Sequence, residues 1–91
     1  MIQAASWTLL EEVQYKEGGI LSRGWDTYPI FRFNAVPDTA VFVINRPGQP
    51  PVGAGEAAQG PTAAAIANAI YHATDSRLRE LPLKSSKIDW K

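Results

Sequence analysis

Apolar side chains recur at helical spacing through the first dozen residues. They are Ile2, Ala5, Leu9 and Val13. This period predicts a short amphipathic helix, and the apolar stripe of that helix needs a partner surface. Past Val13 the pattern changes to alternation, and Glu17-Gly18-Gly19 offers a turn before Ile20 and Leu21. That arrangement predicts a β-hairpin directly after the helix.

The next stretch, residues 22–36, has no clear period but is rich in aromatic side chains. These are Trp25, Tyr28, Phe31 and Phe33. Because Pro29 and Pro37 interrupt any long helix, we expect an ordered, partly extended connection. Aromatic rings contribute much of the buried area of a small domain. We therefore expect these rings to fill a core in preference to forming a ligand cage.

Residues 39–45, Thr-Ala-Val-Phe-Val-Ile-Asn, have the strongest strand pattern in the chain. β-branched and aromatic residues occupy both faces, which predicts a central strand covered from two sides. Pro47, Pro50 and Pro51 follow, and a proline has no amide donor for a sheet. The strand is therefore expected to give way to a loop.

A second helix is predicted from Thr62 to about Thr74, with a narrow stripe of small and apolar residues. The stripe consists of Ala63, Ile66, Ala67, Ile70 and Ala73. Gly60, Pro61 and Thr62 are typical of a helix opening, with glycine or threonine at the cap. Residues 77–83 are expected to be extended and residues 85–91 to form a polar tail, in which an exposed Trp90 would indicate a docking surface.

The order of these elements predicts an α+β fold, in which two helices pack on a small antiparallel or mixed sheet. Ninety-one residues correspond to one small domain, residues 1–91. A structured pattern begins within a few residues of Met1, and this abrupt start indicates a piece of a longer protein.

Composition excludes several classes of function. Nine basic and nine acidic residues give a formal charge of zero, so no general attraction to nucleic acid is expected. The chain has no cysteine and one histidine, His72, which excludes thiolate and multi-histidine metal sites, and no metal ligand is predicted. No apolar run could cross a bilayer and no signal peptide is evident, so we expect a soluble protein of the cytoplasm or periplasm.

The most informative stretch is residues 53–62, Gly-Ala-Gly-Glu-Ala-Ala-Gln-Gly-Pro-Thr. Its one carboxylate, Glu56, is framed by residues with very small side chains. Gly53 and Gly55 permit backbone angles closed to other residues and remove the Cβ atoms that would keep a large ligand at a distance. Glu56 is therefore expected to project from an exposed loop that is anchored by a helix.

Two other interpretations of this loop stay open at the level of residue pattern. A glutamate in a glycine-rich turn is more often a solvated charge than a catalytic acid. The stretch also has the first two glycines of a dinucleotide-binding fingerprint, but Ala58 stands at the third and prolines take the place of the preceding strand.

A resemblance to a known family extends over nearly the whole chain. The segments that carry it are Gly53–Glu56, Gly60–Tyr71 and Arg77–Leu83, with Trp7–Val13 and Thr27–Ile30 upstream. The chain resembles the C-terminal part of the molybdopterin-binding large subunit of the xanthine dehydrogenase and aldehyde oxidase family. Ala57–Thr62 stands where xanthine dehydrogenases usually place prolines. This departure makes it most similar to the isoquinoline 1-oxidoreductase branch, which is also related to nicotinate dehydrogenases.

The resemblance implies a role for each residue of the loop. Glu56 would be the active-site base in the hydroxylation of an aldehyde or N-heterocycle, and not a metal ligand. Gly53, Ala54 and Gly55 would let the backbone approach the cofactor, which in the complete enzyme is molybdopterin cytosine dinucleotide. Gln59 would be a weaker candidate for the substrate pocket.

The family's catalytic subunit is much longer than this chain and passes electrons to iron–sulfur centres. The resemblance therefore implies that the remaining lobes of the subunit and an iron–sulfur subunit are partners. It also implies that the isolated chain binds no cofactor and is inactive. The alternative hypothesis is a non-catalytic remnant or interaction module that docks on a partner chain, and an unrelated dinucleotide-binding domain ranks third.

Overall fold

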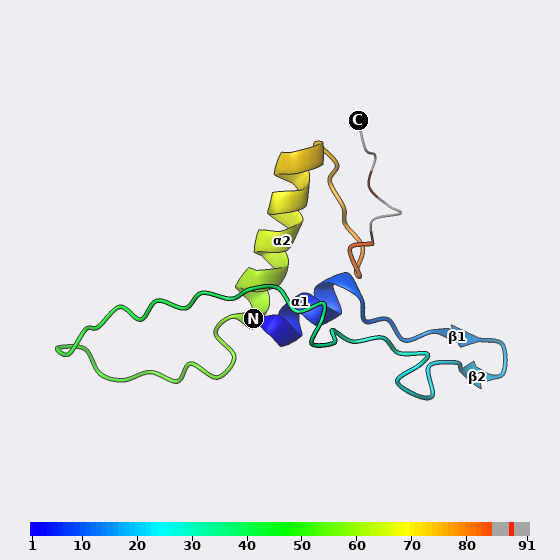
Figure 1. The fold of residues 1–91 in the computed structure, drawn as a ribbon, viewed down its shortest axis with the longest axis horizontal. Helices are drawn as coiled ribbons and strands as arrows, with labels where there is room; N and C mark the ends of the chain where they lie inside the picture. Colours follow the sequence, from blue (N-terminus) through cyan, green and yellow to red (C-terminus); the bar gives the residue numbers. More distant parts are fainter. Residues whose placement is uncertain (85–87, 89–91) are drawn as a thin grey trace.

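The computed structural model of the chain describes residues 1–84 and residue 88. Its elements in chain order are α1 (Ile2–Leu9), β1 (Tyr15–Lys16), β2 (Gly19–Ile20) and α2 (Gln59–Thr74) (Figure 1). Two helices and a two-stranded antiparallel sheet confirm the predicted α+β class. The helices contact each other, and no contact joins either helix to the hairpin within these residues.

Helix α1 forms where the sequence predicts it but ends at Leu9, before Val13. Its buried face is centred on Ala4, Ala5 and Thr8, while Ile2 stays partly exposed. Thr8 is fully buried, and its hydroxyl donates a hydrogen bond to the carbonyl of Ala4 at 2.6 Å. The small side chains on this face allow close approach of α2, because no long side chain holds the two backbones apart.

Helix α2 is also confirmed, but it begins at Gln59, earlier than predicted. Its N-cap residue is Ala58, which provides no side-chain hydrogen bond, so neither glycine nor threonine caps the helix. Pro61 lies in the first turn, where a backbone N–H has no helical acceptor. The predicted stripe is half-buried except for Ala73, and Thr74 is buried in its place.

The predicted hairpin is present, with Tyr15 paired to Ile20 and Lys16 to Gly19. Gly18 has φ of 102° and Gly19 has φ of 138°, a backbone region that disfavours other residues. The turn therefore depends on these two glycines. The hairpin projects into solvent, with all four of its strand residues exposed.

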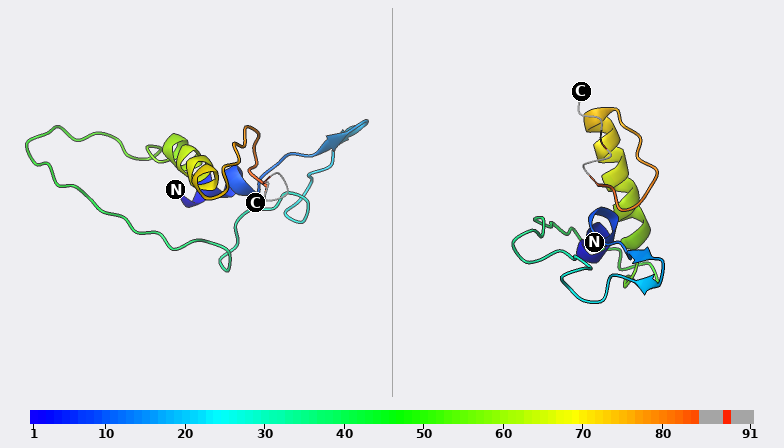
Figure 2. Two further views of the ribbon diagram at one scale, coloured as in Figure 1. Left: turned by 90° about the horizontal axis from the view of Figure 1, so that it is seen from above. Right: turned by 90° about the vertical axis from the view of Figure 1, so that its right-hand side faces the viewer.

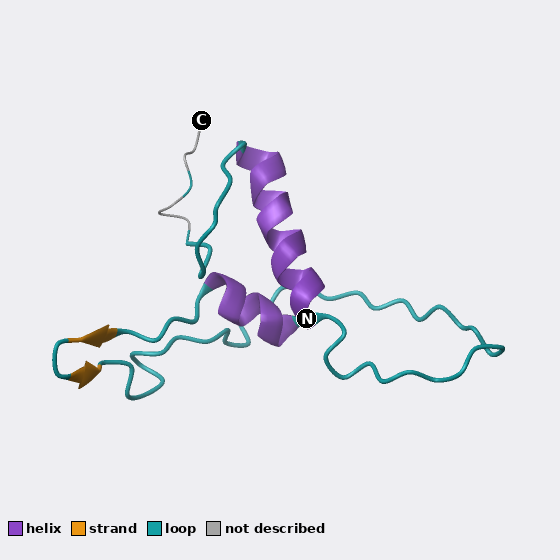
Figure 3. Cartoon of the chain, turned by 180° about the vertical axis from the view of Figure 1, so that it is seen from behind, coloured by secondary structure: helices purple, strands orange, loops and turns teal. Residues whose placement is uncertain are grey.

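The predicted central strand at residues 39–45 is wrong for this chain. The structure assigns no strand to that segment, and its large hydrophobic residues are exposed. A strand pattern describes how well side chains suit a pleated surface, but a strand also needs a neighbour with which to pair. The described residues provide none beside this segment, which lies in a long loop on the side of the helices opposite to the hairpin (Figure 3).

The aromatic residues do not fill a core as predicted. Trp25 and Phe33 are exposed, whereas Tyr28 and Phe31 are half-buried. The buried hydrophobic residues in the described part of the chain are Ala4, Ala5 and Leu83. This core is too small to shelter several aromatic rings.

After α2 the chain turns back towards α1 (Figures 1 and 2). Residues 77–83 contain no helix, as expected. The backbone N–H of Leu83 donates to the carbonyl of Thr8 at 2.7 Å, and Lys84 forms an ion pair with Glu12. This return segment ties the two helices together from outside. The predicted exposure of Trp90 concerns a residue outside the described part of the chain.

No helix among the described residues combines the length and the apolar character that spanning a bilayer requires.

Candidate functional site

The candidate site is the loop that leads into α2, and its central residue is Glu56. The side chain of Glu56 is exposed, as the sequence predicts. Its carbonyl oxygen accepts a hydrogen bond from the backbone N–H of Gln59 at 3.1 Å, which forms the turn that begins α2. The helix therefore fixes the backbone of Glu56 and leaves its carboxylate open to solvent.

No described residue holds that carboxylate. Within residues 1–84 and 88, the ion pair found in the structure joins Lys84 to Glu12, and Glu56 takes part in neither an ion pair nor a side-chain hydrogen bond. A carboxylate in a sealed salt bridge could not act on a ligand. The arrangement seen here leaves Glu56 available.

Gly53 and Gly55 flank Ala54 immediately before Glu56. A Cβ atom added at either glycine would meet nothing within 4 Å, and neither glycine has φ in the left-handed region. The expectation that these glycines supply unusual backbone angles is therefore not met in this structure. Their contribution is an open surface with no side chain to block an approaching molecule.

The backbone of residues 53–55 fits the approach of a large polar cofactor. Among the described residues, nothing accepts a hydrogen bond from the backbone N–H groups of Gly53, Ala54 or Gly55. These N–H groups are free to donate to an acceptor atom of a bound molecule. Neither glycine has the left-handed φ of a phosphate-binding nest, so the backbone alone does not select an anion.

Gln59 is the first residue of α2, and its side chain is exposed. The structure thus places it beside Glu56, at the end of the same turn. An open groove lies farther along α2, lined by Ile2, Pro37, Thr62 and Ile66 among others. Neither Glu56 nor Gln59 lines that groove, so the loop residues stand apart from it.

His72 is exposed near the end of α2. The histidine lies on the last turn, while Glu56 precedes the first. The structure therefore does not bring these two groups together.

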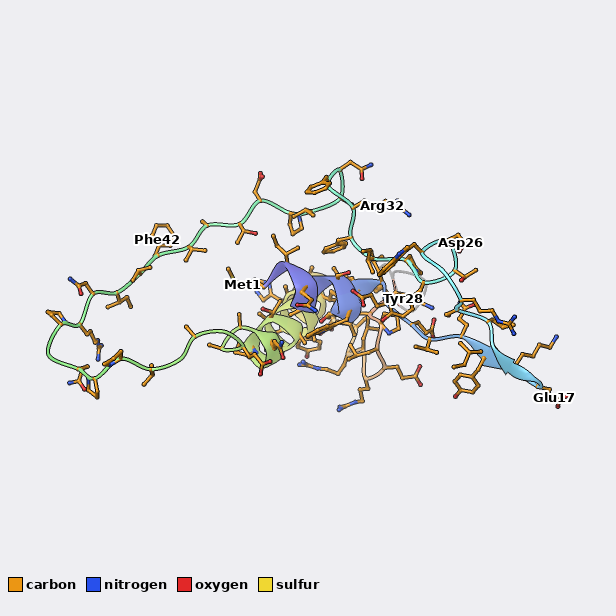
Figure 4. The ribbon with its side chains drawn as sticks, turned by 90° about the horizontal axis from the view of Figure 1, so that it is seen from below. Met1, Glu17, Asp26, Tyr28, Arg32 and Phe42 are labelled. Carbon is orange, nitrogen blue, oxygen red and sulfur yellow. The ribbon has the colours of Figure 1, made fainter. Side chains whose placement is uncertain are left out.

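Sequence reasoning did not find a contact between Glu11 and Tyr28. The Tyr28 hydroxyl donates a hydrogen bond to Oε2 of Glu11 at 2.9 Å, and this bond, with a smaller contribution from burial, raises the pKa of Tyr28 above its usual value of 10.0. Figure 4 shows Tyr28 beside the first helix. The two residues are 17 apart in the sequence, so no local spacing could have indicated the pair.

Comparison with known proteins adds a relationship that geometry alone does not provide. Over 88 residues, the chain is 43% identical to a protein of Pseudomonas putida that is named as a subunit of nicotinate dehydrogenase. The chain is similar to one short segment of that protein. The alignment covers 97% of this chain but 7% of the relative. No family model and no solved structure matches the chain.

The similarity to one segment of the nicotinate dehydrogenase subunit agrees with the predicted relation to nicotinate dehydrogenases. The isoquinoline 1-oxidoreductase branch stays a prediction. Because the alignment covers nearly all of this chain, it includes the loop that bears Glu56. The alignment covers 7% of the relative, so the similarity does not assign the activity of the whole relative to this chain.

Proposed function

We propose that the chain is the C-terminal module of a molybdenum hydroxylase and supplies Glu56 as the active-site base. The observation that carries the proposal is the similarity of nearly the whole chain to the nicotinate dehydrogenase subunit. The exposure of Glu56 on a loop of small residues supports it. The substrate class is an N-heterocycle or an aldehyde with an electron-poor carbon.

In this proposal Glu56 moves one proton. Its carboxylate takes up the proton that the attacking oxygen loses as it bonds to the electron-poor carbon. When bound, the molybdenum cofactor supplies the two-electron oxidation of that carbon. In the same proposal Gln59, an exposed residue on the same turn, donates a hydrogen bond from its amide to a ring nitrogen or a carbonyl of the substrate.

The backbone N–H groups of Gly53, Ala54 and Gly55 would hold part of the cofactor, in the molybdopterin cytosine dinucleotide form. The rest of the site comes from the remaining lobes of the molybdopterin-binding subunit, and an iron–sulfur subunit receives the electrons. The isolated chain is inactive, because no described residue orients Glu56 or shields it from water.

The test is reconstitution. The chain is co-expressed with the nicotinate dehydrogenase subunit of Pseudomonas putida from which the matched segment has been deleted, together with the partner subunits of that enzyme. Hydroxylation of an aromatic N-heterocycle is then measured for the wild-type chain, for Glu56→Gln and for Glu17→Gln. Glu17 is an exposed glutamate on the hairpin and serves as the matched control.

We expect Glu56→Gln to lower kcat by about 10²- to 10⁴-fold, which is the usual contribution of a general base. Glu17→Gln should keep the wild-type rate. Equal rates for Glu56→Gln and the wild type, in complexes of equal cofactor content, would refute the catalytic assignment.

A second function, docking without catalysis, is favoured by one specific observation. The loop between β2 and α2 exposes a run of large hydrophobic side chains at residues 41–44. Such a run marks an interaction site. Stable assembly with a rate that does not depend on Glu56 would favour this alternative.

A further inference from the structure

Residues 39–45 combine a strand pattern with exposure to solvent. The exposed fractions of four consecutive side chains are 69% for Val41, 89% for Phe42, 88% for Val43 and 79% for Ile44. Val41 and Val43 alternate with Phe42 and Ile44, so an extended backbone would carry apolar side chains on both faces. Exposing such a run to water is unfavourable, and burying it against another apolar surface is favourable.

The backbone of this segment is also unpaired. No backbone hydrogen bond joins residues 38–45 to any part of the chain that the structure describes. The segment lies between Pro37 and Pro47, and neither proline interrupts the amides between them. Both edges of the segment can therefore form a full hydrogen-bond ladder.

We propose that residues 39–45 pair as an inner β-strand with a sheet of the polypeptide that completes the molybdopterin-binding subunit. This inference rests on the proposed function, because it takes that polypeptide to be the counterpart of the rest of the Pseudomonas putida relative. In the relative, the matched segment is 7% of a much longer chain, which has ample length to supply such a sheet.

A second copy of this chain does not fit the segment as well. Two copies would form a ribbon of two strands, and a two-stranded ribbon is marginally stable in water unless a third strand or a helix covers it. The strands among the described residues are β1 and β2, which pair with each other in the hairpin, so the described chain supplies no third strand beside this segment. The partner must therefore provide neighbouring strands and a cover on each face.

Strand pairing would also give Glu56 a defined position. Residues 46–52 connect the segment to the loop of Gly53–Glu56, and α2 fixes the other end of that loop through the hydrogen bond between Gln59 and Glu56. With the segment held in a sheet, the loop is anchored at both ends. In the chain alone it is anchored at one.

The test uses hydrogen exchange on the reconstituted complex and on the chain alone. In the chain alone, the amides of residues 40–45 should exchange near the rates of an unstructured peptide. In the complex, their exchange should slow by at least about 100-fold, because ladder hydrogen bonds must open before exchange.

A pair of variants tests backbone pairing directly. Val43→Pro removes one amide from the middle of the segment, whereas Val52→Pro removes one from the same loop outside it. Val43 and Val52 are exposed to a similar degree, 88% and 86%. Neither substitution should therefore reduce the stability of the chain alone by much. We expect Val43→Pro to weaken assembly by about tenfold or more and Val52→Pro to leave it within about twofold.

Each outcome decides the matter. Assembly without protection of residues 40–45, equal binding of the two proline variants, or no assembly at all would overturn the strand proposal. Protection that grows with the concentration of the chain alone would identify a second copy as the partner and would also overturn it. Protection in the complex together with full activity of Glu56→Gln would leave the strand proposal intact and refute the catalytic one.

Discussion

Three glutamates differ in whether another described side chain holds their carboxylate in place. Glu11 accepts a hydrogen bond from Tyr28, and Glu12 forms an ion pair with Lys84. Both partners hold the segment that follows α1. Glu56 has no such partner among residues 1–84 and 88. The chain thus uses its own contacts for structure and leaves the proposed base to be oriented from outside.

The Glu11 and Tyr28 pair predicts a pH dependence at the alkaline end. The pKa of Tyr28 is raised because its protonated hydroxyl donates to a carboxylate. A pKa that is higher in the folded than in the unfolded chain gives stability that is complete below about pH 10 and is lost as the pH rises above it. Glu11→Gln should lower the pKa of Tyr28 and reduce that loss.

The measurement is an NMR titration of tyrosine labelled with ¹³C at Cζ, carried out on the wild type and on Glu11→Gln. The Tyr28 resonance should titrate at higher pH in the wild type than in the variant. An unchanged Tyr28 titration in Glu11→Gln would contradict the assigned cause.

The residue at the C-terminal end of α2, Asp75, should affect the stability of the chain through its backbone conformation. It ends α2 with φ of 60°, a left-handed conformation that aspartate and asparagine tolerate better than alanine. Asp75→Ala should lower the free energy of unfolding by about 1 kcal/mol, while Asp75→Asn stays close to the wild type. Urea denaturation followed by far-UV circular dichroism measures both, and equal losses in the two variants would exclude the backbone explanation.

At the scale of elements, the return segment after α2 stabilises the helix pair. Leu83 is 5% exposed, whereas Leu81, two residues earlier, is 60% exposed. Leu83→Ala should reduce the free energy of unfolding by about 2 to 3 kcal/mol, because it removes a buried side chain. Leu81→Ala should change it by less than about 0.5 kcal/mol. Chemical denaturation compares the two, and similar losses would show that the segment does not dock as described.

The elements that the sequence predicts well are those that local signals determine. α1 and α2 follow from apolar periodicity, and the hairpin follows from Gly18 and Gly19, which adopt the backbone angles that the turn requires. The strand predicted at residues 39–45 is absent, because strand formation depends on a neighbour that the described residues do not provide. The start of α2 was misplaced because Ala58 gives no capping signal.

The candidate site was predictable in position but not in detail. Small residues around Glu56 indicate exposure, and the structure shows it. The same residues suggested unusual glycine angles, which Gly53 and Gly55 do not adopt. Nothing in the residue pattern indicates how the carboxylate is oriented, and no described residue forms an ion pair or a hydrogen bond with it.

At the scale of the whole molecule, the chain is too open to resemble a self-sufficient domain. Its Cα radius of gyration is 16.7 Å, and its extents are 56 × 36 × 25 Å. A compact domain of this length would have a radius of gyration of about 12 Å. The excess comes from the hairpin and the long loop, which extend in opposite directions from the helices (Figure 2). This shape suits a piece that wraps around other polypeptide.

The long loop should be separable from the rest of the fold. Replacing residues 41–57 with a glycine and serine linker of about eight residues should change the free energy of unfolding by less than about 1 kcal/mol, because loop closure depends weakly on length. The shortened chain should nevertheless fail to assemble with the remaining lobes. Urea denaturation and co-purification test the two parts, and a loss of helix stability above about 2 kcal/mol would contradict the first.

The groove beside the start of α2 has a consequence for how such a protein can diverge. Its lining joins Ala40, where the loop leaves, to Thr62 and Ile66, just after the loop returns. The excursion therefore starts and finishes at one place on the helix pair. Like an antibody hypervariable loop on its framework, it can change at little cost to the folding of the helix pair. The helix pair can thus keep its structure while the loop adapts to the polypeptide around it.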